Sequence, residues 1–309
     1  MGDLICHYTT LEVLLSLLRN AEDKKLTFWA SSIYSMNDPT EFMYGYDICM
    51  DILQKVEKRL KVSDKLKVSK LWMDIHDDSS NDWKEILIQS LYENNECPFV
   101  VSFSKLKDSL PLWKMYGNNG YGVCLVFSEY LVKPFNPNVI EPQIYNSIHL
   151  YDVGYGTIHQ SEYDIFNKIV ESRYKKYLST ICQNGCNNIF EKKLSLLCLT
   201  LVICSPCIKH PSYAYEQEKR LLKYYLKESN QKVQFYEKNN NIISYTEVQI
   251  PIDNLKEIIV GPCPDFQSIS RSITQLLHSQ ELNPQDIKIV QSEVPSVSYT
   301  HLTLPTNRE

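Results

Sequence analysis

The chain has 309 residues and a hydrophobic fraction of 43%, which is enough to bury a substantial core. Its net charge of −5 excludes a general electrostatic attraction to nucleic acid or to an anionic membrane, although it leaves room for a local basic patch. The chain does not open with a basic segment followed by an apolar one, so we expect no signal peptide and a cytoplasmic location, where the ten cysteines stay reduced.

Helices are predicted along the whole chain. Thr9, followed by Glu12 three residues later, predicts a capping box that opens the first helix. A turn at 37–41 opens a longer helix, in which apolar residues recur at intervals of three and four. The most apolar helix contains residues 194–203, a run well short of the roughly 20 residues that cross a bilayer. Further helices are expected at 110–116, 162–180, 187–203 and around 269–277.

Strands are predicted between these helices. A hairpin is expected over 231–250, turning at 239–241. The remaining strands are expected at 4–8, 26–30, 99–104, 121–127, 257–260, 287–290 and in the run that follows Tyr215. Because strands and helices mix without a regular βαβ rhythm, the sequence predicts an α+β fold with a mixed sheet core and helical insertions.

No linker-like segment divides the chain, so we expect a single domain over residues 1–295, with a charged helical insertion at 61–96. Residues 296–309 differ in character from what precedes them. The stretch Val297-Ser298-Tyr299-Thr300-His301-Leu302 looks like a translated sequencing adapter. We therefore interpret 296–309 as a non-native tail and expect the natural end of the chain to be missing.

A charged column stands out in the run Tyr215-Glu216-Gln217-Glu218-Lys219-Arg220. If a strand begins at Glu216, its period of two places Glu216, Glu218 and Arg220 on one face. Two carboxylates and a guanidinium are costly to bury. The column is therefore either a solvated ladder or a functional site.

Several short motifs together resemble a known family. They are His7-Tyr8-Thr9 before a helix, Asn37-Asp38-Pro39-Thr40-Glu41, Ser102-Phe103-Ser104, Trp113-x-x-Tyr116 before Gly120-x-Gly122, the run from Tyr215 to Arg220, and Ile258-Ile259-Val260-Gly261-Pro262. In this order, from about residue 4 to 295, they resemble the bacterial domain-of-unknown-function family numbered 2971. That family has no established chemistry, so the resemblance implies a relationship and no reaction.

A second resemblance concerns the fold. ADP-ribosyltransferases of the Arg/His–Ser–Glu type place a basic residue on the first strand, a Ser-x-Ser strand next and a Glu-x-Glu pair late in the chain. This sequence is similar in offering His7, then Ser102 and Ser104, then Glu216 and Glu218. The resemblance implies an ADP-ribosyltransferase-like fold with NAD as a substrate.

The same resemblance implies roles for single residues. Glu218 would accept the ribose 2′-hydroxyl and stabilise the positive charge of the transition state, and Glu216 would orient or deprotonate the acceptor. His7 would bind the adenosine ribose or phosphate edge, and Arg220 would keep the carboxylates ionised or bind a diphosphate. The other implied contacts to NAD come from Tyr8, Thr9, Ser102, Ser104 and Tyr121; Asn37, Asp38, Glu41, Trp113 and Tyr116 are further candidate site residues.

Each candidate also has a structural interpretation. His7 and the two serines are equally typical of hydrogen-bonded strand residues. Asp38 can cap the helix that follows it, with Glu41 closing the capping box. Trp113 and Tyr116 lie one helical turn apart, and aromatic pairs at this spacing usually belong to a core.

Metal binding is the competing hypothesis for the cysteines. A Cys-x-x-Cys pair, Cys204 and Cys207, and two upstream thiols, Cys182 and Cys186, supply four ligands of the kind that hold zinc. Their spacing is irregular, and free cysteine is commonly a small core residue, so we expect no metal.

Three functions are compatible with these patterns. The first is an NAD-dependent ADP-ribosyltransferase or NAD-consuming toxin, used in conflict between phage, plasmid and host, with an unidentified macromolecular acceptor. The second is a non-catalytic nucleotide-binding or sensing module. The third is a structural protein stapled by zinc. The first requires His7, a serine of 102–104 and Glu218 to converge on one cleft, whereas the second tolerates a cleft with Glu218 turned away. The third requires Cys182, Cys186, Cys204 and Cys207 to lie within bonding reach of a common point.

Overall fold

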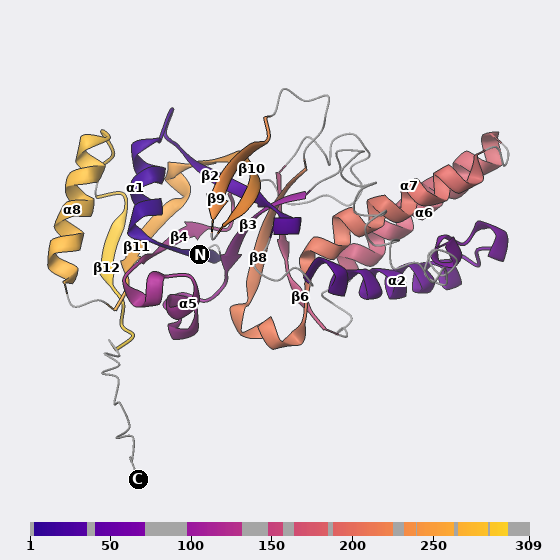
Figure 1. Cartoon of the computed structure of the whole chain (residues 1–309), viewed down its shortest axis with the longest axis horizontal. Helices are drawn as coiled ribbons and strands as arrows, with labels where there is room; N and C mark the ends of the chain where they lie inside the picture. The colour runs from indigo at the N-terminus through magenta and orange to yellow at the C-terminus, as the bar shows by residue number, and fades with distance from the viewer. Residues whose placement is uncertain are drawn as a thin grey trace, which may run out of the picture.

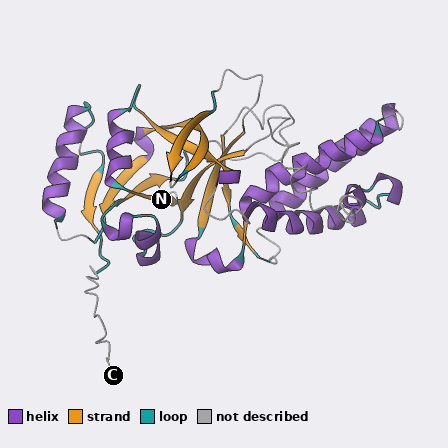
Figure 2. Cartoon of the chain, in the orientation of Figure 1, coloured by secondary structure: helices purple, strands orange, loops and turns teal. Residues whose placement is uncertain are grey.

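A ten-stranded sheet forms the centre of the molecule, and helices pack around it (Figures 1 and 2). The computed structural model describes residues 3–35, 41–71, 98–131, 148–156, 164–184, 188–224, 232–238, 240–262, 265–283 and 285–295. Within these ranges, no helix is both long enough and apolar enough to cross a membrane.

Strand β1 (Leu4–Thr9) lies inside the sheet. It pairs antiparallel with β4 (Val123–Ser128) along its whole length and with β3 (Pro98–Ser104) at Cys6. Beyond β4 follow β11 (Leu255–Val260), which is antiparallel, and β12 (Lys288–Gln291), which is parallel to β11. The sheet is therefore mixed, as the sequence predicts.

The sheet branches at β3. One edge of this strand pairs along its full length with β8 (Glu218–Tyr224), which in turn pairs with β5 (Ile148–Asp152). The other edge is shared between β1, at Ser104, and β2 (Lys25–Ser32), at Phe99 and Val100. Beyond β2 follow β10 (Asn241–Pro251) and β9 (Gln234–Lys238), which form the predicted hairpin.

Two groups of helices cover different parts of the sheet. Helices α1 (Leu11–Arg19) and α8 (Phe266–Ser279) bury their apolar faces on the core that includes β2 and β11. A second group, α2 (Glu41–Arg59), α6 (Asp164–Asn184) and α7 (Ile189–Cys204), extends away from the β8 side and has its own apolar core (Figure 1). We call these three helices the helical arm.

Three local predictions are wrong. Strand β8 begins at Glu218 and not at Glu216, because Glu216 ends the 3₁₀ segment η5 (Pro211–Glu216) and Gln217 turns the chain at a φ of 42°. The cap of α1 is Thr10, whose hydroxyl accepts from the amide of Val13, and Thr9 stays in β1. Strand β5 falls in a stretch that was not predicted to form a strand.

Two very short strands, β6 (Gly154–Tyr155) and β7 (Ile208–Lys209), were not predicted either. They form a separate two-stranded parallel pair beside η5. Of the predicted insertion at 61–96, only residues 61–71 belong to the described part of the chain, and they contain the 3₁₀ turn η2 (Asp64–Leu66). The predicted tail, 296–309, lies outside the described residues.

Candidate functional site

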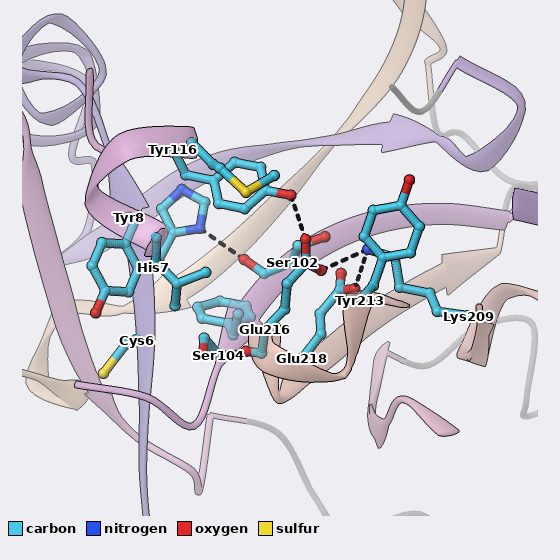
Figure 3. Close-up of a pocket in the computed structure, with 13 residues that line it drawn as sticks. Cys6, His7, Tyr8, Ser102, Ser104, Tyr116, Lys209, Tyr213, Glu216 and Glu218 are labelled. Carbon is cyan, nitrogen blue, oxygen red and sulfur yellow. Dashed lines mark hydrogen bonds and ion pairs between the residues drawn. The ribbon is translucent and has the colours of Figure 1, made fainter. Parts of the chain in front are cut away.

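A cavity of about 270 Å³ opens beside the adjoining strands β1, β3 and β8 (Figure 3). Helix α5 (Leu110–Met115) and the segment from β7 to η5 supply the rest of its wall. The lining side chains are Cys6, His7, Tyr8, Ser102, Phe103, Ser104, Leu112, Met115, Tyr116, Lys209, Tyr213, Glu216 and Glu218. The structure thus brings together predicted residues from three distant parts of the sequence.

Glu218 is held by two buried cations. Arg220 lies two residues along β8 on the same face, with Nε 2.9 Å from Glu218 Oε1 and Nη2 3.1 Å from Oε2. Lys209 Nζ lies 3.0 Å from Oε2. Burial opposes ionisation of Glu218, but these two cations and a side-chain hydrogen bond from Ser102 outweigh it and lower its pKa to about 2. Glu218 is therefore a carboxylate at neutral pH.

Glu216 shares the same lysine. Lys209 Nζ lies 2.7 Å from Glu216 Oε2, and the hydroxyl of Tyr116 donates to Oε1 at 2.8 Å. The ring of Tyr213 lies over Lys209, 4.9 Å from the ammonium to the ring centroid. Lys209 thus bridges the two carboxylates at the edge of the cavity (Figure 3).

The interpretation of the Glu-Glu-Arg column as a solvated ladder is wrong. Glu216, Glu218 and Arg220 are 3%, 5% and 0% exposed, respectively. The guanidinium of Arg220 also donates to the carbonyl oxygen of Pro206. Buried charges survive only when they are paired, and here two carboxylates face two cations. The column is a closed charge network that borders the cavity.

His7 lies on β1 beside two aromatic rings. Its ring centroid is 5.3 Å from that of Phe28 and 5.6 Å from that of Phe103. Burial lowers the pKa of His7, so the ring is neutral at neutral pH. Nδ1 lies 2.9 Å from the carbonyl oxygen of Ser102, which can only accept, so Nδ1 carries the proton and Nε2 remains an acceptor.

The two serines of β3 have different roles. Ser102 lines the cavity, and its hydroxyl is among the groups that lower the pKa of Glu218. Ser104 instead bonds the backbone: its hydroxyl donates to the carbonyl oxygen of Glu216 and accepts from the amide of Leu106 at 2.9 Å. Ser104 therefore fixes the turn that carries Glu216, as the structural interpretation of the serines predicts for this residue.

Tyr8 and Trp113 support the wall formed by α5. The Tyr8 hydroxyl donates to the carbonyl oxygen of Leu106 and accepts from the amide of Ser109, at 2.9 and 2.8 Å. The ring of Trp113, fully buried, packs edge-on against Tyr8 at 5.0 Å between centroids. Trp113 is thus a core residue next to the cavity, one helical turn from Tyr116.

Several predicted site residues do not line the cavity. Tyr121 is 59% exposed and Thr9 is buried in β1, and neither is a lining residue. Arg220 lies behind Glu218. Asn37 and Asp38 are outside the described residues, and so is the side chain of Glu41, which begins α2.

Sequence reasoning missed Lys209 and Tyr213. Lys209 follows the Cys204–Cys207 pair, which drew attention to zinc and away from the lysine. The useful signal was a lone lysine in an otherwise apolar stretch before the Glu-x-Glu pair, since a buried lysine needs nearby carboxylates.

The cysteines of the zinc hypothesis do not share one environment in the part of the chain that the structure describes. Cys204 and Cys207 are buried in the core of the helical arm, whereas Cys182 is exposed, and Cys186 lies outside the described residues. Burial raises the pKa of both Cys204 and Cys207, which favours the protonated thiol. In the part of the chain that the structure describes, no three His, Cys, Asp or Glu side chains are grouped to hold a metal ion.

Comparison with known proteins yields one match. No curated protein and no solved structure matches the chain significantly. Residues 112–221 match the model of a family described as Protein of unknown function (DUF2971). This stretch contains Trp113, Tyr116, Lys209, Glu216 and Glu218, so the part of the chain that supplies most of the charged cavity wall is similar to that family.

Proposed function

We propose that this protein cleaves the bond between nicotinamide and ribose in NAD and transfers the ADP-ribose to an acceptor, with Glu218 at the centre of the site. One observation carries the proposal: His7, Ser102 and Glu218 come from the neighbouring strands β1, β3 and β8 and line one cavity. This is the combination of side chains that the resemblance to ADP-ribosyltransferases requires.

The charge state of the site suits this chemistry. The bond from C1′ to the nicotinamide nitrogen breaks, its electron pair leaves with nicotinamide, and positive charge develops on the ribose. An ionised Glu218 accepts a hydrogen bond from the 2′-hydroxyl and stabilises that charge. The acceptor then forms its bond to C1′ and gives up a proton, and Glu216, which shares Lys209 with Glu218, is the carboxylate that accepts it.

The volume of the cavity suits one half of the dinucleotide. About 270 Å³ is at or below the usual range for a pocket that encloses a whole drug-sized ligand. In the proposed complex the nicotinamide and its ribose enter between Tyr116, Ser102 and Glu218. His7 is neutral, and its Nε2 is free to accept from a ribose hydroxyl.

A second candidate function is nucleotide binding without chemistry, and Lys209 favours it. Its ammonium already bridges Glu216 and Glu218. A 2′-hydroxyl must therefore compete with Lys209 for Oε2 of Glu218 before it can be oriented. Charged side chains that are paired with one another can shape a binding site without taking part in a reaction, and a sensing module requires no more than that.

Nicotinamide release from NAD tests the proposal. We expect release by the full chain and its loss in Glu218→Gln, with retention in Glu22→Gln, which removes the same charge from an exposed position. Thermal unfolding of Glu218→Gln separates a lost catalytic group from a lost fold. Absence of both release and NAD binding, measured by calorimetry, would refute the proposal, whereas binding without release would establish the second candidate.

A further inference from the structure

The helical arm has a basic groove at the end of α2. The groove has a volume of about 590 Å³, and the turn that follows α2 folds back to form its second side. Lys58 and Lys61 line it near the end of the helix, and Lys67 and Lys70 line it from the turn. It is separate from the cavity described above and shares none of its lining residues.

The buried carboxylate of Glu57 positions the second side of this groove. Glu57 is 2% exposed and accepts hydrogen bonds from the amides of Val68 and Ser69, at 2.8 and 2.9 Å. The hydroxyls of Ser69 and Tyr174 also donate to it. These bonds satisfy Glu57 internally and fix the turn that brings Lys67 and Lys70 opposite the end of α2.

The groove carries an excess of unpaired positive charge. Residues 54–71 contain seven Lys or Arg side chains and two carboxylates, in a chain whose net charge is −5. One carboxylate is the buried Glu57, and the other, Asp64, pairs with Lys67 at 2.5 Å. Within the described part of the chain, no carboxylate lies within ion-pair distance of Lys58, Lys61 or Lys70.

A second basic groove lies on the same arm. It runs between α6 and α7 and has a volume of about 290 Å³; its charged lining residues are three cations, Arg173, Lys176 and Lys192, and one carboxylate, Glu191. An ion pair at 2.7 Å between Arg59 of α2 and Glu171 of α6 joins the two helices that carry the grooves. Near the start of α7, Phe190 is 57% exposed and precedes Lys192 by two residues. Two basic grooves and an exposed ring suit a long anionic polymer better than a single small anion.

We propose that the helical arm binds the sugar–phosphate backbone of a nucleic acid, with Lys58, Lys61 and Lys70 as phosphate contacts. Lysines without carboxylate partners gain most from phosphates, since binding releases the counterions of the polymer and breaks no ion pair. Residues 54–71 thus form a local surface with an excess of positive charge, which allows a protein with net negative charge to approach a polyanion. The proposal is independent of NAD chemistry.

Fluorescence anisotropy tests the proposal with labelled 20-nucleotide single-stranded DNA, RNA of the same sequence and the DNA duplex. The full chain is titrated in about 50 mM and about 200 mM salt, a range over which phosphate contacts weaken strongly. For the triple variant Lys58→Gln/Lys61→Gln/Lys70→Gln, we expect Kd to rise at least about tenfold at the lower salt concentration. We also expect the slope of log Kd against log salt to fall by about 2 to 3, roughly one for each lost contact.

The matched control is Lys25→Gln/Lys232→Gln/Lys238→Gln, which removes the same charge from exposed positions away from the arm. It should bind like the unmodified chain. Two outcomes would overturn the proposal: no binding to any of the three probes, or equal weakening by both triple variants. A circular dichroism melt of each variant confirms that the arm is folded in the comparison.

Discussion

Arg220 contacts both carboxylate oxygens of Glu218, at 2.9 and 3.1 Å, although the two residues are only two positions apart on one strand. Side chains at this spacing lie on the same face of a strand, so no distant segment is needed to bring the two residues together. Distant segments then complete the network, with Lys209 on the carboxylate and the carbonyl oxygen of Pro206 on the guanidinium. The ion pair between Arg220 and Glu218 is therefore local in sequence, and the other contacts of the network come from the tertiary fold.

We expect Arg220→Met to lower the free energy of unfolding by about 3–5 kcal/mol, because it leaves Glu218 buried beside Lys209 alone. Urea unfolding at pH 7 measures the change. Arg271→Met, on the exposed face of α8, is the control and should change the value little. A loss below about 1 kcal/mol for Arg220→Met would mean that the network does not depend on this pair.

Glu218 makes stability depend on pH in a defined window. Its pKa is about 2 in the folded protein and 4.5 for an unperturbed glutamate, so its contribution is fully present above about pH 4.5 and is lost as the pH falls toward 2. We expect the unmodified chain to lose about 3 kcal/mol more than Glu218→Gln across this window. Urea unfolding of both proteins at several pH values gives the difference, and parallel curves would contradict the assignment.

Tyr116 and Glu216 should be energetically coupled through the hydrogen bond at 2.8 Å. Because Tyr116 is partly exposed, we expect Tyr116→Phe to lower stability by only about 1 kcal/mol. A double-mutant cycle with Glu216→Gln should give a coupling energy of similar size. Additive effects of the two substitutions would show that the hydroxyl does not stabilise the carboxylate.

Asp108 joins the wall of the cavity to the last described residues. Its carboxylate accepts from Trp113 Nε1 and the amide of Glu293, both at 2.7 Å, and from the hydroxyl of Ser292. We expect Asp108→Ala to cost about 2–3 kcal/mol and to speed amide hydrogen exchange at Glu293. The control, Asp286→Ala, should leave exchange at the Glu293 amide unchanged. If Asp108→Ala also leaves it unchanged, the hydrogen bonds of Asp108 do not hold this segment in place.

Much of the fold could be predicted because local patterns match the final packing. The apolar spacing of α2 places Tyr46, Cys49, Leu53 and Val56 in the core, and all four are fully buried. The strand signals at β1, β3, β4 and β11 come from continuous apolar runs, as expected of strands inside a sheet. The hairpin of β9 and β10 follows from turn residues alone.

The rest depends on contacts that no local pattern encodes. Nothing in the sequence indicates that β3 pairs on one edge with two different strands, or that Lys209 lies between Glu216 and Glu218. In the motif Gly120-x-Gly122, the structure explains the second glycine: a Cβ at Gly122 would lie 2.1 Å from the carbonyl oxygen of Thr9. Gly122 therefore reflects close backbone packing at the end of β1.

The branching of the sheet at β3 has a consequence for the order in which the molecule opens. Amides of Phe99 and Val100 lie in a strand whose two edges are both covered, so exposing them requires the separation of β2 as well as β8. Residues of α5, a short helix on the opposite wall, are free of that constraint. Local opening of the native state should therefore expose the amides of α5 first, whereas those of Phe99 and Val100 stay protected until global unfolding.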